Sequence, residues 1–280
     1  MFTASAEQHA KLDALKEHLE ALGCVCVAYS GGVDSTFLIK VAHDVLGNKA
    51  FALTNHCSLY PLREHAESVD FASSECFEQT VVSLDPLQLP EFQDNPPDRC
   101  YHCKKALFSQ LQAMADDIAR SKGLVDTGEH ATLIDGSNLS DLDDYRPGHK
   151  AVVELGVVSP LQQAQLTKQD IRDLSRELGL PTWDKPSYAC LASRFPYGTH
   201  ITAELLERAD KAEQLMMDAG FRTVRVRMHE NGALARIEVE SGRIAEALAF
   251  LQAEGTAALH SIGFKHVSLD ADGYRTGSMN

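Results

Sequence analysis

A strand-to-helix turn near the N-terminus constrains the fold of this chain more than any other feature. The apolar run from Val25 to Tyr29 has the composition of a buried parallel strand. It breaks at Gly31 and Gly32, and apolar residues then recur with helical spacing from Ser35 onward. The glycines permit a tight turn, and the N-terminus of the helix that follows carries a partial positive charge. The sequence therefore predicts a turn that can hold an anion.

The other residues of this turn make the prediction more specific. Two serines can donate hydroxyl hydrogen bonds, and Asp34 can hold Mg²⁺ against phosphate oxygens. A plain structural turn would explain the glycines but not the serines and the aspartate. The string resembles the pyrophosphate loop of the ATP pyrophosphatase superfamily, whose members cleave ATP to AMP and pyrophosphate. That resemblance implies ATP binding at Ser30, Gly31, Gly32, Val33, Asp34 and Ser35. The Gly-Lys-Ser/Thr ending of a Walker loop is missing, which disfavours kinase or GTPase chemistry.

Strand and helix patterns alternate through the first two thirds of the chain. This order predicts an α/β fold, a parallel twisted sheet with helices on both faces. Predicted strands follow at 49–54, 80–84 and 133–136, and 86–97 reads as an irregular loop. Predicted helices begin at 61, 104 and 166, and Thr167 caps the start of the last one. After Gly198 the pattern changes to a small α+β unit, with helices at 202–220 and 242–253 and strands at 223–228, 235–239 and 265–269. Asn231 and Gly232 predict a hairpin between the first two of these strands. We therefore expect two domains, 1–198 for ATP and 199–280 for substrate binding or oligomerisation.

Composition narrows the classes of partner. The 40 acidic residues exceed the 26 basic ones and give a net charge of −14, which lowers the expectation of a nucleic-acid substrate. No apolar stretch is long enough to span a bilayer, and the N-terminal residues form an amphipathic helix and not a signal peptide. A cytoplasmic protein without membrane or nucleic-acid partners is expected. Seven cysteines, an odd number, make a disulfide framework unlikely and favour metal, cluster or thiol chemistry.

Three of the cysteines are candidates for chemistry. Cys100 and Cys103 form a Cys-x-x-Cys pair just before the helix predicted from 104, and Cys190 lies in a later loop. The pair alone could be half a zinc site, a redox dithiol or an accident, and no second pair exists to complete a four-cysteine zinc site. Three thiolates could instead hold an iron–sulfur cluster with one iron open. The other cysteines, Cys24, Cys26, Cys57 and Cys76, read as small buried hydrophobic residues.

Polar residues elsewhere are candidates for substrate contacts. Asn138 and Asp141 follow a predicted strand, where ligands of parallel sheets bind. Arg194 could clamp a phosphate or carboxylate, or could simply be solvated. Arg225 and Arg227 share one face of a strand, which suits a nucleotide phosphate, although an exposed edge strand with charged side chains would show the same pattern.

Several strings together resemble the LarE family, in order and over nearly the whole chain. They are 30–35, 98–105, 135–141, 190–198, 225–227, 235–238 and 273–278. Members of that family are ATP-dependent sulfur transferases that act on pyridinium-3,5-biscarboxylic acid mononucleotide and help to build the nickel-pincer cofactor of lactate racemase. The resemblance implies a PP-loop domain of the adenine-nucleotide α-hydrolase type, adenylation of a substrate carboxylate, and attack by a sulfur nucleophile that releases AMP and leaves a thiocarboxylate. The resemblance also favours substrate binding as the role of Arg194, Arg225 and Arg227.

The resemblance also assigns the cysteines. Cys190 matches the sulfur-bearing cysteine, which in some members gives up its own sulfur and becomes dehydroalanine. Those members lack the Cys-x-x-Cys pair, so this chain resembles the other subgroup. There, three cysteines, here Cys100, Cys103 and Cys190, hold a 4Fe–4S cluster. Glu213 and Glu238 are weaker candidates for a metal or interface role because surface carboxylates are common. Relatives assemble from several subunits, so a homo-oligomer is expected.

Three rival functions remain. A tRNA thiolase would share the loop and the cysteines, but the acidic balance and the strings from Arg225 onward disfavour it. An amidotransferase-type synthetase such as NAD synthetase would give the three cysteines no functional role. A non-catalytic nucleotide-binding module would not need Asp34 and the second hydroxyl at Ser35.

Overall fold

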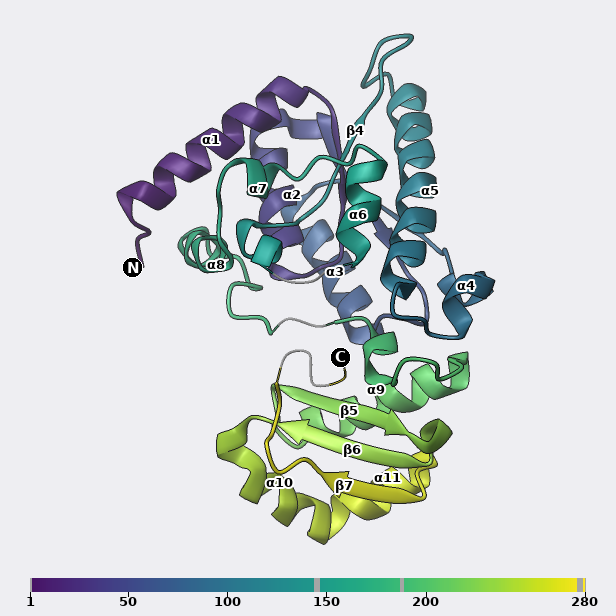
Figure 1. Ribbon diagram of the computed structural model, residues 1–280. Helices are drawn as coiled ribbons and strands as arrows, with labels where there is room; N and C mark the ends of the chain where they lie inside the picture. Colours follow the sequence, from purple (N-terminus) through teal and green to yellow (C-terminus); the bar gives the residue numbers. More distant parts are fainter. Residues whose placement is uncertain (1, 144–146, 187–188, 276–278, 280) are drawn as a thin grey trace. The chain divides into compact units, whose positions relative to one another are not determined.

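The computed structural model describes residues 2–143, 147–186, 189–275 and 279 (Figure 1). It divides into two compact units, and each is described by itself. The first unit consists of Met1–Cys57, Leu62–Leu84 and Cys100–Ser187, and the second of Ser58–Pro61, Asp85–Arg99 and Tyr188–Asn280. The second unit thus takes two short segments from the first 99 residues of the chain. The predicted boundary after Gly198 stays a prediction.

A four-stranded parallel sheet forms the centre of the first unit. Its strand order is β3-β2-β1-β4, and every neighbouring pair is parallel. The strands are β1 (Val25–Ala28), β2 (Ala50–Asn55), β3 (Gln79–Val82) and β4 (Thr132–Ile134). β1 and β2 are buried along almost their whole length, as continuous apolar runs in a parallel sheet predict.

Helices cover both faces of this sheet. Because side chains alternate along a strand, Val25 and Val27 of β1 enter one hydrophobic cluster and Cys24 and Cys26 the other. The first cluster includes residues of α1, α2 and α8, and the second includes residues of α5, which Figure 1 shows as the longest helix beside the sheet. The helices are α1 (Ala6–Leu22), α2 (Val33–Leu46), α3 (Leu62–Glu75), α5 (Arg99–Ser121), α6 (Pro147–Glu154), α7 (Pro160–Gln163) and α8 (Lys168–Glu177), with the 3-10 turns η1 (Gly47–Lys49) and η3 (Leu139–Asp143). The predicted α/β class is confirmed.

The second unit contains a three-stranded sheet of mixed direction. β5 (Val224–His229) and β6 (Leu234–Val239) are antiparallel, and β7 (His266–Leu269) pairs in parallel with β6. Asn231, in the predicted hairpin, has the left-handed backbone of such turns, with φ of 53°. The helical segments are η4 (Leu191–Arg194), α9 (Ala203–Asp218), η5 (Glu230–Gly232), η6 (Ser241–Arg243), α10 (Ile244–Phe250), the π-helical η7 (Leu251–Gly255) and α11 (Thr256–Ile262). This is the predicted small α+β architecture.

Two segments differ from the sequence-based expectation. Residues 86–97 are not wholly irregular, because prolines at their first positions start the short helices η2 (Pro86–Gln88) and α4 (Pro90–Gln93). The helix predicted at 242–253 continues to Ile262. Gly255 does not end it, because this glycine keeps a helical backbone, with φ of −61°, at the junction with α11. No helix in the described part of the chain is long and apolar enough to cross a membrane.

Asp170 links the N-terminal helix to α8 and makes a testable contribution to stability. Its carboxylate closes a capping box with Thr167 and lies 2.9 Å from the Lys11 ammonium. Burial raises the pKa of Asp170, but the hydrogen bonds from Lys11, Thr167 and Gln8 outweigh it and lower that pKa from 3.8 to about 2. The stabilisation is therefore complete above pH 3.8 and disappears as the pH falls to about 2.

We expect Asp170→Asn to lower the free energy of unfolding at pH 7 by about 1–2 kcal/mol. Urea denaturation at a series of pH values measures the loss, which should shrink as the pH falls from 3.8 toward 2. Asp13→Asn is the matched control, since Asp13 forms only an exposed pair with Lys16 and should change stability little. A loss that stays constant through the acid range would contradict the assignment to the ionised carboxylate.

Candidate nucleotide and cysteine sites

The loop from Ser30 to Ser35 connects β1 to α2 and has the geometry of an anion cradle. Gly32 is the N-cap residue of α2, so the first free N–H groups of the helix belong to this loop. Gly31 has φ of +72°, and a Cβ there would come within 2.9 Å of Ser68 Cβ on α3. A side chain at Gly31 would therefore be excluded both by the backbone conformation and by the close approach of α3.

The two predicted serines face each other within the loop. Ser30 Oγ lies 3.0 Å from Ser35 Oγ, and Ser35 Oγ also accepts a hydrogen bond from Ser30 N at 3.2 Å. Val33 is buried in the first hydrophobic cluster, so only its backbone can contribute to the loop. The six predicted residues thus form one continuous turn, at the carboxyl end of β1, where ligands of parallel sheets bind.

Asp34 places a carboxylate in the loop, where it contacts residues from two other elements. Its Oδ1 accepts a hydrogen bond of 3.3 Å from Asn138 Nδ2, and its Oδ2 lies 2.5 Å from Lys168 Nζ. Asn138 comes from the loop after β4, which approaches so closely that a Cβ at Gly136 would lie 3.0 Å from Ser35 N. The structure therefore brings together two residues, Asp34 and Asn138, that the sequence placed at separate strand ends.

Asp141 and Ser140 hold Asn138 in place. Asp141 Oδ2 accepts a hydrogen bond of 3.0 Å from Asn138 N, and Asn138 Oδ1 accepts one of 3.0 Å from Ser140 N. The Asp141 carboxylate thus holds the backbone of Asn138 in the loop. Whether Asn138 and Asp141 contact a substrate stays a prediction.

Lys168 is a candidate that the sequence analysis missed. It is the first residue of α8, after the predicted cap Thr167, and its backbone N–H donates to Ser140 Oγ at 3.1 Å. The cap indicated the residue at which the helix begins, but nothing in the sequence indicated that this N-terminus lies beside Asp34. Lys168 brings a positive charge to Asp34 and to the anion cradle.

A second lysine, Lys185, binds the backbone of the loop. Lys185 Nζ donates to the carbonyl of Gly31 at 3.1 Å and lies 2.7 Å from Glu64 and 2.6 Å from Glu67. Burial lowers the pKa of Lys185, but its hydrogen bonds to the two glutamates outweigh it and raise that pKa. Burial also raises the pKa of Glu64, which Lys185 only partly offsets. The pairing is largely buried at Lys185 and Glu64 and exposed at Glu67, and it fixes the position of the Gly31 carbonyl.

The Cys-x-x-Cys pair lies inside a helix, which corrects the prediction that it precedes one. α5 begins at Arg99, five residues earlier than expected, so Cys100 and Cys103 occupy its first turns. The apolar periodicity begins only at Leu107, which is why the start was placed too late. Arg99 anchors this end through its side chain to Asn95 and its N–H to the carbonyl of Pro96. Cys100 is exposed and Cys103 half-buried.

Cys190 belongs to the second unit and is half-buried, at the N-cap of the turn η4. Ser193 N donates to the carbonyl of Cys190 at 2.9 Å and closes this turn, and Leu191 N donates to the carbonyl of Leu59. Among the described residues, no three His, Cys, Asp or Glu side chains are arranged to hold a metal ion. A cluster on Cys100, Cys103 and Cys190 therefore stays a prediction.

The arginines predicted to bind substrate are buried, and this corrects two of the simpler alternatives. Arg194 is fully buried and not solvated, and Arg225 and Arg227 lie in β5, which is buried along five of its six residues and is not an exposed charged edge. The carboxylates are also not at the surface. Glu213 and Glu238 are buried, and each pairs with an arginine.

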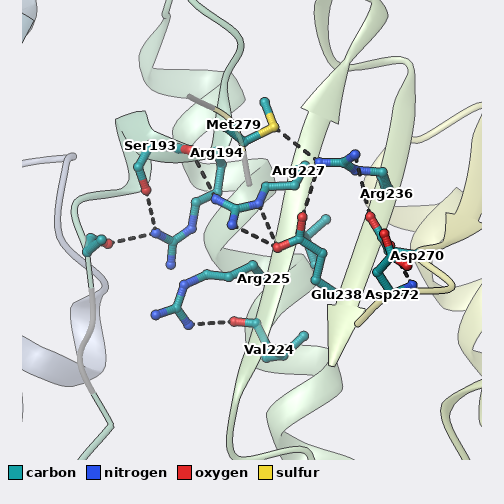
Figure 2. Close-up of polar contacts among 12 residues, drawn as sticks. Ser193, Arg194, Val224, Arg225, Arg227, Arg236, Glu238, Asp270, Asp272 and Met279 are labelled. Carbon is teal, nitrogen blue, oxygen red and sulfur yellow. Dashed lines mark hydrogen bonds and ion pairs between the residues drawn. The ribbon is translucent and has the colours of Figure 1, made fainter. Parts of the chain in front are cut away.

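Figure 2 shows the part of this arginine network on β5 and β6. Arg227 Nε and Nη2 donate to Glu238 Oε2 at 3.0 and 2.7 Å, and Arg236 Nη2 donates to the other oxygen of Glu238 at 3.1 Å. The guanidinium of Arg225 lies 4.9 Å from the centre of the Tyr274 ring. Burial and then the like charge of Arg194 lower the pKa of Arg225. Substrate contacts by Arg194, Arg225 and Arg227 stay predictions.

Comparison with known proteins identifies relatives of the whole chain. An uncharacterized protein of Synechocystis, slr1717, is 39% identical over 279 residues, which cover 96% of this chain and 97% of that protein. The pyridinium-3,5-bisthiocarboxylic acid mononucleotide synthase of Lactiplantibacillus plantarum is 37% identical over 281 residues, covering 100% of this chain and 96% of the synthase. An uncharacterized protein of Methanocaldococcus jannaschii, MJ0830, is 25% identical over 253 residues, 90% of this chain and 91% of that protein.

No model of a protein family matches the chain. The similarity to the synthase nevertheless covers the whole chain, including the loop from Ser30 to Ser35 and both units. The chain therefore belongs to the enzyme family of the pyridinium-3,5-bisthiocarboxylic acid mononucleotide synthase.

Proposed function

We propose that the protein is an ATP-dependent sulfur transferase that converts a carboxylate of pyridinium-3,5-biscarboxylic acid mononucleotide into a thiocarboxylate, a step in making the nickel-pincer cofactor of lactate racemase-like enzymes. The observation that carries the proposal is the similarity to the synthase over the full length of the chain, which includes the loop at Ser30 and Cys190. The geometry of the loop supports it, because the loop, Asp34, Asn138 and Lys168 form a site suited to a polyphosphate.

In the first half-reaction, an oxygen of the substrate carboxylate attacks the α-phosphorus of ATP and pyrophosphate leaves. The N–H groups at the start of α2 and the hydroxyls of Ser30 and Ser35 would bind the pyrophosphate oxygens. The partly exposed Asp34 carboxylate, held by a hydrogen bond from the Asn138 amide nitrogen, supplies oxygen ligands of the type that Mg²⁺ prefers, so this residue fits the metal. Bound there, Mg²⁺ would neutralise phosphate charge.

In the second half-reaction, a sulfur nucleophile attacks the acyl carbon of the adenylate and AMP leaves. If Cys190 supplies its own sulfur, its thiolate forms a thioester, and loss of the Cα proton with cleavage of the Cβ–S bond leaves dehydroalanine and the thiocarboxylate. The more specific proposal, from the resemblance, is that Cys100, Cys103 and Cys190 hold a 4Fe–4S cluster. In that case Cys190 keeps its sulfur, and inorganic sulfide would supply the sulfur that replaces the carboxylate oxygen lost with AMP, so that the protein turns over more than once.

The test of the proposed function is an anaerobic incubation with ATP, Mg²⁺ and the mononucleotide, with and without added inorganic sulfide. Mass spectrometry of the small molecules should show sulfur in exchange for oxygen, with AMP and pyrophosphate released together. The analogue with both carboxylates converted to amides is the control, because it cannot be adenylated. An unmodified mononucleotide, together with AMP release that tRNA stimulates, would sink the proposal and favour a tRNA thiolase.

Iron analysis separates the two sources of sulfur. Roughly four irons per chain in the wild type, lost in Cys103→Ala, would support the three-cysteine cluster. An iron-free protein whose Cys190 loses the mass of its sulfur during the reaction would instead be sacrificial.

Lys168 gives a further prediction for the first half-reaction. We expect Lys168→Ala to slow pyrophosphate release by about tenfold to a hundredfold, because it removes the positive charge beside Asp34 and the loop. Lys40→Ala is the matched control, since Lys40 pairs with Asp44 on the surface of α2. Steady-state kinetics with ATP as the varied substrate measures the effect. Equal rates in the Lys168 and Lys40 variants would remove Lys168 from the site.

A further inference from the structure

The carbonyl of Gly31 is held by a side chain that comes from far along the chain. Lys185 Nζ donates to this carbonyl at 3.1 Å and also pairs with two glutamates of α3. The Lys185 side chain is only 11% exposed, so its ammonium is held mainly by these three oxygen acceptors and little by water. The position of the Gly31 carbonyl therefore depends on where the backbone places Lys185.

The peptide between Gly31 and Gly32 links that carbonyl to an N–H group of the anion cradle. A trans peptide is planar, so the carbonyl of Gly31 and the N–H of Gly32 point in opposite directions. Gly32 is the N-cap of α2, and its N–H donates to Ser30 Oγ at 3.4 Å, the hydroxyl that also lies 3.0 Å from Ser35 Oγ. Lys185 thus holds one side of this peptide while the N–H on the other side faces the serine hydroxyls.

Arg172 of α8 holds the segment that carries Lys185. Its Nη1 donates to the carbonyl of Trp183 and its Nη2 to the carbonyl of Lys185, each at 2.7 Å. Between α8 and η4, the described residues belong to no helix or strand, so these carbonyls have no partner in regular secondary structure. The planar guanidinium binds both at once in a fixed geometry. Arg172 therefore determines where Lys185 lies.

We propose that Arg172 is a positioning residue for the binding of pyrophosphate. It fixes the backbone at Lys185, and Lys185 fixes the Gly31 carbonyl. The planar peptide then directs the Gly32 N–H into the anion cradle, where a displacement of about 0.5 Å would weaken the contact with the anion. The effect of Arg172 passes through Lys185 and the loop backbone. The inference rests on the proposed function in taking the anion to be the pyrophosphate of ATP.

The experiment measures the binding of magnesium pyrophosphate to the full-length protein by isothermal titration calorimetry. We expect Arg172→Gln to raise the dissociation constant of pyrophosphate about tenfold. The dissociation constant of adenosine, which carries no phosphate, should stay unchanged. A general loss of structure would weaken both ligands, so the comparison separates positioning from stability. Arg172→Lys, which keeps the charge without the planar fork, should bind pyrophosphate with intermediate affinity.

A double-mutant cycle tests whether Arg172 acts through Lys185. Lys185→Gln shortens the side chain and removes its charge but leaves an amide donor for the buried Glu64. The double variant, Arg172→Gln with Lys185→Gln, should bind pyrophosphate no more weakly than Lys185→Gln alone. Losses that multiply in the double variant would show two independent effects and would overturn the proposal.

Arg176→Gln is the matched control. Arg176 lies on the same helix, and its guanidinium lies 4.7 Å from the centre of the Trp183 ring and 4.7 Å from that of the Phe2 ring. It contacts the Trp183 side chain, whereas Arg172 binds the backbone, so pyrophosphate binding should stay at the wild-type level. Trp183 is the one tryptophan of the chain, and acrylamide quenching of its fluorescence should increase in both variants.

A folded Arg172→Gln protein with the wild-type affinity for pyrophosphate would overturn the proposal, and so would equal losses of affinity for pyrophosphate and adenosine. If Arg172→Gln does not fold, Arg172→Lys decides in the same way. A wild type that binds no pyrophosphate would also refute the inference. Formation of the thiocarboxylate by the wild type is measured in parallel. A wild type that binds pyrophosphate but forms no thiocarboxylate would refute the proposed function and leave the result for Arg172 standing.

Discussion

Cys190→Ala is expected to abolish formation of the thiocarboxylate, with a loss of at least about a thousandfold, because no other group at this position can supply or hold the sulfur. The defect should lie in the second half-reaction. A single burst of pyrophosphate is therefore expected to remain, since the loop at Ser30 and its phosphate contacts are made by other residues. Rapid-quench measurement of pyrophosphate, with mass spectrometry of the product, separates the two half-reactions.

Cys76→Ala is the control for this experiment. Cys76 is exposed, which corrects the expectation that it is buried, so its thiol is also open to reagents. It directly follows α3 and belongs to no predicted motif. Its variant should form product at the wild-type rate. Product formation by Cys190→Ala would show that the sulfur reaches the substrate without this residue.

Asp34→Asn is expected to reduce ATP cleavage by about a hundredfold or more, because it removes the carboxylate that pairs with Lys168 and would bind Mg²⁺. The substitution keeps the size of the side chain and an oxygen that can accept from Asn138. Lys168 is partly exposed, so its ammonium remains hydrated and the fold should survive. Pyrophosphate release at increasing Mg²⁺ concentration measures the effect, with a higher Mg²⁺ requirement expected in the variant.

Asp44→Asn provides the comparison for Asp34→Asn. Asp44 lies on the same helix, α2, and forms only a surface pair with Lys40. It should leave ATP cleavage and its Mg²⁺ dependence unchanged. An Asp34→Asn protein that cleaves ATP at the rate of the Asp44 variant would exclude Asp34 from the site.

The residues that could be placed from sequence are those fixed by local patterns. The loop at Ser30, the cap at Thr167 and the hairpin at Asn231 each depend on neighbouring residues, and the structure confirms the conformations of all three. Alternation of strands and helices was enough to predict the α/β class, because parallel strands need helical crossovers.

The residues that could not be placed depend on partners far along the chain. Arg194 pairs with Glu213, 19 residues later, and Lys168 pairs with Asp34, 134 residues earlier. A single sequence gives no sign of such pairing, so a buried arginine looks the same as a solvated one. The start of α5 was missed for a local reason, because its first turns carry no apolar residue that marks the helical period.

The early segments of the second unit, Ser58–Pro61 and Asp85–Arg99, are synthesised long before the rest of that unit. Asn95, from the earlier part of the chain, is fully buried and donates to the carbonyls of Phe195 and Pro196, about 100 residues later, and Ile201 N donates back to the carbonyl of Gln93. At ribosomal rates these early residues wait about 5 to 20 s for their partners to be synthesised. During that interval Phe92 and Asn95 lack the burial that the finished unit gives them. We therefore expect nascent chains stopped before residue 190 to be captured by chaperones through this stretch.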